Sequence, residues 1–333
     1  LEGADTAFDF DTAITADITL YARYDMLNIE DGTPAHPFLI RTVDDFIAFA
    51  ERINNPDEEG NAVYRTACYR LEADLDLTGR TWIPVGKKVT TEDEDGNEVT
   101  LNGFSGTFDG NGHTIGNLTV SRKMRSAGVT TVGLFGIAER AYFHDFTLKN
   151  IQYTVESYAP NTAVGTAIGG VVAQAELCTF RNIRVEGVID PALCAENPAY
   201  IGGIVGYHAT TARDGPAYIS YIQNCSVDLE IKNGINEEGD PGDMRGAVTG
   251  GIAGYVTTSR CAAAIVNCTV AGPIKAGRYT GGVVGYISGN YVSIVNCANY
   301  APVTSTSTAA VKDPTYTGGI LGYSSGNNTV MDC

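Results

Sequence analysis

The stretch Gly202-Gly203-Ile204-Val205-Gly206-Tyr207 decides the fold of this 333-residue chain, because it recurs through the second half of the sequence. Successive copies begin 31 to 48 residues apart. Repeats of that length indicate stacked supersecondary units, since each unit can bury its apolar face only against its neighbours. The six copies span residues 132–137, 169–174, 202–207, 250–255, 281–286 and 318–323.

A second motif follows each copy and is centred on Asn or Asp, as in Ile222-Gln223-Asn224-Cys225. We expect Ile222 and Cys225 both to point inward, which strict strand alternation does not allow. Asn and Asp tolerate the left-handed conformation, so Asn224 is predicted to mark a bend. Its equivalents in the other repeats are Asp145, Asn182, Asn267, Asn296 and Asp332.

Each repeat therefore contains a strand at the glycine motif, a bend, and a second strand after the Asn. Equivalent side chains of successive repeats would stack at about 4.8 Å, the spacing of parallel strands. The sequence thus predicts an all-β parallel β-helix. A β-propeller is disfavoured, because its blades need about 40 residues and the shortest repeat has 31.

The repeats also predict columns of identical residues. A cysteine column would serve as small buried filler, because Cβ atoms about 4.8 Å apart exceed the roughly 3.5–4.5 Å of a disulfide. A disulfide or metal role is the alternative. A tyrosine column would pack as a ladder near a corner, and would become a sugar-stacking surface if exposed. The columns are Cys225, Cys268, Cys297 and Cys333; Asn224, Asn267 and Asn296; and Tyr207, Tyr255, Tyr286 and Tyr323.

A short helix over 42–54 is predicted before the repeats. Thr42 suits the N-cap, and Asp45 completes a capping-box-like start. One apolar stripe at helical spacing follows, and Asn54-Asn55-Pro56 ends it. The stripe consists of Val43, Phe46, Ile47, Ala50 and Ile53. Such a helix would cap the open end of the first coil.

Charge and length limit the partners. With 22 basic and 39 acidic residues, the net charge of −17 makes nucleic acid, anionic lipid and polyanionic glycans poor partners. No segment approaches the roughly 20 apolar residues of a transmembrane helix, so we expect no membrane insertion by this segment. The chain begins at Leu1 without a signal-peptide pattern and ends at Cys333 inside a motif. We expect both ends to be cut points in a longer parent.

With both motifs identified, residues 37–333 resemble the GLUG-motif proteins. The family is named for a Gly-hydrophobic-hydrophobic-Gly signature, here Gly203-Ile204-Val205-Gly206. Its lead-in is similar to Pro37–Ile40 with the helix, Tyr69–Leu77, Trp82–Gly86 and Phe104–Leu118. The resemblance implies a right-handed parallel β-helix in large exported bacterial surface proteins, often adhesin-like and common among gut anaerobes. It implies no catalytic residues.

Residues 8–24 resemble the end of a Listeria–Bacteroides repeat, a small β-grasp-like module found in strings on bacterial surface proteins. That family usually closes on Trp, where this chain has Tyr24. The expected domains are a C-terminal fragment of such a repeat over 1–25, a linker over 26–36, and the β-helix over 37–333. Two surface-protein families in one chain imply an extracellular location on the bacterial surface, either cell-wall anchored or secreted.

Other patterns suggest chemistry but fit a structural role better. Residues 109–116 are similar to a glycine-rich phosphate loop, yet a strand follows, which favours a turn. Residues 93–98 loosely resemble a calcium loop without its flanking helices. The four histidines, at 36, 113, 144 and 208, show no metal-ligand spacing. A glycosidase needs two carboxylates about 5–9.5 Å apart, and nothing singles out two among Glu176, Glu186, Asp190, Asp228 and Glu230.

The sequence therefore predicts no catalytic, cofactor-binding or metal-ligating residue. We expect a non-catalytic extracellular structural or adhesion module, a rigid β-helix with binding delegated to loops. Its partners would be neighbouring domains of the parent chain and surface glycans or glycoproteins of host or microbe. The alternatives are a β-helix polysaccharide lyase or glycoside hydrolase, favoured by a carboxylate pair in a groove, and a glycan-binding module, favoured by an exposed aromatic strip without one. We also expect loops at 92–98 and 233–244, and an unprotected coil at 318–333.

Overall fold

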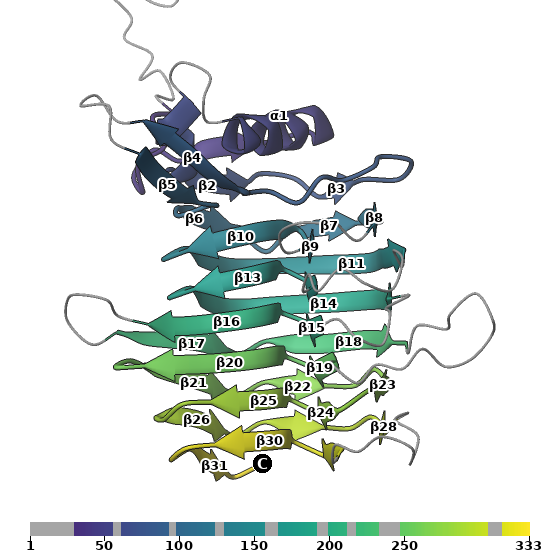
Figure 1. Ribbon diagram of the computed structural model, residues 1–333. Coiled ribbons are helices and arrows are strands. Elements are labelled where there is room, and N and C mark those ends of the chain that lie inside the picture. Colours follow the sequence, from purple (N-terminus) through teal and green to yellow (C-terminus); the bar gives the residue numbers. More distant parts are fainter. Residues whose placement is uncertain are drawn as a thin grey trace, which may run out of the picture.

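Parallel strands dominate the computed structural model, which describes residues 30–55, 61–92, 98–123, 130–156, 166–191, 199–211, 218–232, 247–305 and 315–333. Figure 1 shows them stacked between helix α1 (Val43–Asn54) and strand β31 (Thr329–Met331). In the three large sheets all strand pairings are parallel, and along the repeats they join equivalent strands of successive units. The chain is all-β in a solenoid-like arrangement, compatible with the predicted β-helix.

The glycine motif lies between two six-stranded sheets. In one repeat, β15 ends at Gly202 and β16 begins at Val205. The sheet before the motif consists of β9 (Thr130–Val132), β12 (Thr166–Gly169), β15 (Ala199–Gly202), β19 (Ala247–Gly250), β24 (Tyr279–Gly281) and β29 (Tyr316–Gly318). The sheet after it consists of β10 (Phe135–Glu139), β13 (Val172–Glu176), β16 (Val205–Thr211), β20 (Ala253–Ser259), β25 (Val284–Ser288) and β30 (Leu321–Ser325).

The third large sheet has 17 strands and contains the Asn motif. Its strands are β1 (Phe38–Ile40), β2 (Cys68–Leu71), β3 (Leu75–Asp76), β6 (Thr107–Asp109), β7 (Thr114–Gly116), β8 (Thr119–Lys123), β11 (Tyr142–Glu156), β14 (Thr179–Pro191), β17 (Ile219–Gln223), β18 (Ser226–Ile231), β21 (Ala262–Val266), β22 (Thr269–Val270), β23 (Ile274–Ala276), β26 (Val292–Val295), β27 (Ala298–Asn299), β28 (Val303–Ser305) and β31. A separate antiparallel pair joins β4 (Lys88–Glu92) to β5 (Glu98–Asn102).

The glycines of the motif allow main chains of two sheets to meet. A Cβ atom on Gly206 would lie 2.7 Å from the carbonyl oxygen of Ile168, and one on Gly254 would lie 2.6 Å from the backbone nitrogen of Ile201. Real Cβ atoms essentially never approach main-chain atoms that closely. The repeat of the motif therefore follows from packing, since each coil makes the same close contact with the coil before it.

The Asn motif forms the predicted bend. Asn182, Asn224, Asn267 and Asn296 have φ angles of 53°, 55°, 54° and 51°, and the two aspartates at this position have similar values. Asn and Asp adopt this left-handed conformation more readily than other non-glycine residues. The bend reverses the alternation, so that Ile222 and Cys225 are both buried.

Helix α1 confirms the predicted cap. Thr42 accepts from the Asp45 backbone N–H, and the Asp45 carboxylate accepts from the Thr42 backbone N–H. Phe46 stacks on Trp82 with ring centroids 4.6 Å apart. The predicted stripe was incomplete, because Phe49 is also buried whereas Val43 and Ile47 are only half-buried.

The other local predictions have mixed outcomes. The turn at 109–116 is confirmed, because Asn111 and Gly112 have positive φ between β6 and β7. The loop at 92–98 was wrong at its ends, since Glu92 and Glu98 pair within the β4–β5 hairpin. Residues 93–97, 233–244 and 1–29 lie outside the described residues, and with them the fragment assigned to 1–25. Among the described residues, no helix has the length and apolar character to cross a membrane.

The last coil is less covered than those before it. Ile320 and Leu321 are half-buried, whereas their equivalents Val283 and Val284 are fully buried. Val330 is 45% exposed, although it pairs in register with the buried Ile294. In the isolated chain, the coil at 318–333 therefore has the exposure expected of an unprotected end.

Candidate functional site

The predicted tyrosine column forms a continuous ladder of ring contacts on the outer face, stacked between Tyr207 and Tyr255 and edge-to-face at the other two steps. Tyr207, Tyr255, Tyr286 and Tyr323 pair in register on β16, β20, β25 and β30. Successive ring centroids are 5.3, 5.0 and 5.2 Å apart, within the range of favourable aromatic pairs.

Three further tyrosines, missed by the sequence analysis, extend this column across the neighbouring sheet. Tyr200, Tyr279 and Tyr316 lie on β15, β24 and β29, two residues before the first glycine of the motif. Their ring centroids lie 5.4 Å from Tyr207, 5.0 Å from Tyr286 and 4.7 Å from Tyr323, respectively. The pattern Tyr-x-Gly-Gly would have revealed them. We call the seven residues the tyrosine cluster: Tyr200, Tyr207, Tyr255, Tyr279, Tyr286, Tyr316 and Tyr323.

The tyrosine cluster is half-exposed and rich in hydroxyl groups. All seven side chains are half-buried. Burial raises the pKa of Tyr200, Tyr207 and Tyr279, so their hydroxyls stay protonated and can both donate and accept. Thr257, Ser288 and Ser325 follow two positions later on the same strands. Arg278 lies over the Tyr279 ring, 4.9 Å from its centroid. The surface therefore offers ring faces and hydroxyls with little charge.

The Asn column forms a polarised hydrogen-bond ladder. The Asn224 amide donates to Asn182 Oδ1 at 3.1 Å, Asn267 to Asn224 at 3.1 Å, and Asn296 to Asn267 at 2.8 Å. Asn182 donates to Asp145 Oδ1 at 2.7 Å, so an acceptor-only carboxylate ends the ladder. Its role is therefore structural.

The cysteine column is buried except at its last member. Cys225, Cys268 and Cys297 are buried, Cys333 is exposed, and all four thiols are free. The thiol of Cys225 and burial raise the pKa of Cys268. The burial of Cys225, Cys268 and Cys297 agrees with the expected role of small apolar filler.

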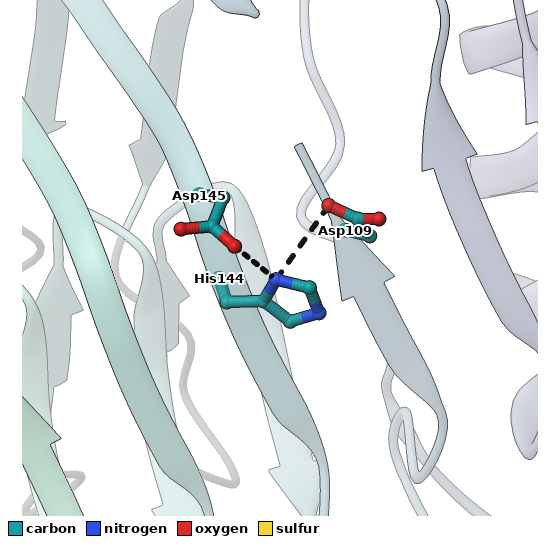
Figure 2. Close-up of side chains that lie close together, drawn as sticks. All are labelled: Asp109, His144 and Asp145. Atoms are coloured by element: carbon teal, nitrogen blue, oxygen red, sulfur yellow. Dashed lines mark hydrogen bonds and ion pairs between the residues drawn. The ribbon is translucent and has the colours of Figure 1, made fainter. Parts of the chain in front are cut away.

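The spacing argument missed one polar cluster, because Asp109 lies on a different strand from His144 and Asp145. Figure 2 shows His144 between Asp145, its neighbour on β11, and Asp109 at the end of β6. The His144 Nδ1 lies 2.7 Å from Asp145 Oδ2 and 3.5 Å from Asp109 Oδ1. Single ligand atoms from the three residues lie within 4.8 Å of one another, an arrangement that could hold a divalent cation.

The contacts around this cluster already satisfy its carboxylates. Asp109 Oδ2 faces Arg70 Nε at 3.6 Å, and Asp109 Oδ1 accepts from the backbone N–H of Asn111. Although burial opposes it, the hydrogen bonds from Asn182 and His144 lower the pKa of Asp145. The cluster thus joins two coils and ends the Asn ladder. The prediction of no metal-ligating residue stays a prediction.

The acids considered for glycosidase chemistry are dispersed, although two of them meet. Glu186 and Asp228 pair in register on β14 and β18, and Glu186 binds the Arg184 guanidinium. Asp190 pairs with Lys232 at 3.5 Å. Two hollows among the described residues contain one carboxylate each, Glu51 in a cavity of about 980 Å³ and Asp145 in one of about 360 Å³.

Comparisons with known proteins support the architecture. No protein-family model matches the sequence. Over 188 residues, 54% of this chain, it is 31% identical to halomucin from Haloquadratum walsbyi, a match that spans 2% of halomucin's length. It is similar in structure to a Bacteroides ovatus protein provisionally described as an immunoglobulin A1 protease, with a TM-score of 0.51 and 20% identity over 90% of this chain and 79% of that one. At that identity the likeness concerns the fold alone.

Proposed function

We propose that the chain is a non-catalytic, extracellular structural and adhesion module of a large bacterial surface protein. In this proposal it is a GLUG-motif protein folded as a right-handed parallel β-helix, and residues 1–25 are the end of a Listeria–Bacteroides repeat. One observation carries the proposal: the repeated glycines, asparagines and cysteines all have architectural roles. Gly254 faces a neighbouring main chain, Asn224 bends the strand, and Cys268 fills the core.

The length relation to halomucin supports a modular role. The similar stretch is a small part of that protein, so related sequence occurs inside a very long chain. A solenoid suits such a position, because coils stack on one another and lengthen the molecule without a new core. The partners proposed are neighbouring domains of the parent chain and surface glycans or glycoproteins. The net charge of −17 disfavours nucleic acid.

The tyrosine cluster favours a second, compatible role in glycan binding. Tyrosine presents an apolar ring and a hydroxyl group, which suit the C–H faces and hydroxyls of a neutral sugar. The cluster combines seven such residues on one outer face, and no carboxylate pair is found in the two hollows described above. This is the combination expected of a glycan-binding module.

A glycan array tests this role with matched variants. Tyr279→Ala and Tyr286→Ala should each lose the neutral glycans that the unaltered chain binds, because each removes one ring from the centre of the cluster. Tyr300→Ala serves as the control, since Tyr300 is 76% exposed and lies outside the cluster. An equal loss with Tyr300→Ala, or no bound glycan at all, would remove the cluster from the proposal.

A degradation assay tests the non-catalytic part. The purified chain is incubated with polysaccharides and with immunoglobulin A1, and the products are examined for new reducing ends, unsaturated sugars and peptide fragments. We expect none. A cleavage activity that persists through purification and is lost on heating would favour the enzyme alternative. Glu186 and Asp228 would then be the first residues to replace.

A further inference from the structure

The cavity of about 980 Å³ lies at the end of the stack that helix α1 covers. All of its lining residues precede the tyrosine cluster in the sequence. Helix α1 contributes Ile47 and Glu51 to its wall, and the segment after β3 contributes Arg80 and Ile83. Figure 1 shows α1 lying across this end of the strands. Small-molecule sites commonly have volumes of about 300–1,000 Å³, so the cavity is large enough for a sugar-sized ligand.

The cavity is basic in an acidic protein. Arg80, Lys87 and Arg122 line it, whereas Glu51 is its one acidic lining residue. These are three of only 22 basic residues in a chain of net charge −17, so their grouping favours an anion at this place.

The cation of Arg80 can exchange its present partner for a ligand. Its Nη2 lies 3.6 Å from Asp44 Oδ1, with the two side chains 55% and 86% exposed. Ion pairs that exposed contribute little to stability. A ligand carboxylate that accepts hydrogen bonds from the Arg80 guanidinium through both of its own oxygens could therefore replace Asp44.

The rest of the wall combines hydroxyl groups with aliphatic side chains. Thr81, Ser121 and Thr131 supply hydroxyls. Ile83 is 60% exposed and Ile47 is half-buried, which leaves apolar surface for a ring C–H face. An anion with several hydroxyls and an apolar face matches this wall, whereas a long polyanion would be repelled by the net charge.

We propose that this cavity binds a single acidic sugar residue through its carboxylate, with Arg80, Lys87 and Arg122 as the cationic side. The site goes beyond the function proposed above and does not depend on it.

Calorimetric titration with glucuronic acid tests this site, with its uncharged methyl ester as matched ligand. Glucuronate should bind, and the ester should bind about tenfold more weakly or worse, because it lacks the charge-assisted contacts. Arg80→Gln and Lys87→Gln should each weaken glucuronate binding by a similar factor. Asp44→Asn should leave binding equal or stronger, since it frees Arg80.

Two controls separate this site from general effects. Arg184 is also 55% exposed and ion-paired but lies elsewhere, so Arg184→Gln should leave glucuronate binding unchanged. Tyr300→Ala should also leave it unchanged, since Tyr300 lies outside both the cavity and the tyrosine cluster. Equal binding of acid and ester, an equal loss with Arg184→Gln, or no binding at millimolar glucuronate would overturn the proposal. Inorganic phosphate binding as tightly as glucuronate would indicate a simple anion site and would also overturn it.

Discussion

His208 should make the stability of the stack depend on pH. The residue lies on β16 and is 1% exposed, and its ring meets Phe180 edge-to-face with centroids 6.0 Å apart. Neither ring nitrogen makes a hydrogen bond of normal geometry. Burial lowers the pKa of His208 from 6.5 to about 4, and the nearby main chain of Cys178 opposes the shift only in part.

The sign of the effect follows from proton uptake. Above pH 6.5 the imidazole is neutral in both the folded and the unfolded chain, so it contributes no pH dependence. Between pH 6.5 and 4 only the unfolded chain takes up the proton, and the free energy of unfolding falls by about 1.4 kcal/mol per pH unit. The full loss is about 3 kcal/mol and is complete below pH 4.

His208→Leu isolates this contribution, because leucine has a similar volume and cannot be protonated. Urea unfolding of both proteins from pH 7.5 to pH 4 should show the variant gaining about 3 kcal/mol relative to the unaltered chain as the pH falls. His36→Gln is the control for losing a histidine, since its side chain is 58% exposed. A stability difference that stays constant with pH, or an NMR titration of folded His208 with its midpoint near 6.5, would refute the reasoning.

Three further predictions concern the repeats. Gly251→Ala should destabilise the chain by about 2–3 kcal/mol in urea unfolding, because its Cβ would meet the Gly282 carbonyl. Gly319→Ala should cost less than about 0.5 kcal/mol, because nothing lies within 4 Å of its Cβ. Equal effects of the two substitutions would contradict the packing argument. Asn267→Ala should lower the free energy of unfolding by about 2 kcal/mol, because it removes two ladder hydrogen bonds and places alanine at a left-handed φ of 54°. Asn267→Gly should cost less, because glycine adopts that φ without steric cost. The reverse order would show that the backbone conformation is not limiting. A thiol reagent should label the exposed Cys333 rapidly in the native chain. It should label the buried Cys225, Cys268 and Cys297 only after denaturation. Fast labelling of these three in the native chain would contradict their role as core filler.

The parts of the fold that could be predicted are those set by local backbone chemistry. Asn224 requires a left-handed bend wherever it lies in the stack, and its φ of 55° confirms the prediction made from residue type and alternation. The capping box at Thr42 and Asp45 is equally local, since both partners lie within one helical turn. Repetition then extends each local rule along the chain, because the same motif must fit the same contact in every coil.

The parts that could not be predicted depend on which coils lie side by side. Asp109 and His144 are 35 residues apart and meet because β6 pairs with β11, so no ligand spacing could reveal them. Phe49 was missed because its burial comes from rings on other elements, among them Tyr69 at 4.5 Å and Phe108 at 5.8 Å. Tyr279 was missed for a different reason, since it precedes the glycine motif and belongs to another sheet than Tyr286.

The geometry of the tyrosine cluster limits how a ligand can lie on it. Equivalent rings recur once per coil, at about 4.8 Å along the stack. A chain running along the stack would therefore meet Tyr207, Tyr255, Tyr286 and Tyr323 in succession. A chain crossing the stack would meet only one pair, such as Tyr279 and Tyr286. Because contacts made along one ligand chain reinforce one another, affinity should rise with the length of a linear glycan only in the first orientation, and a length series of one neutral oligosaccharide distinguishes the two.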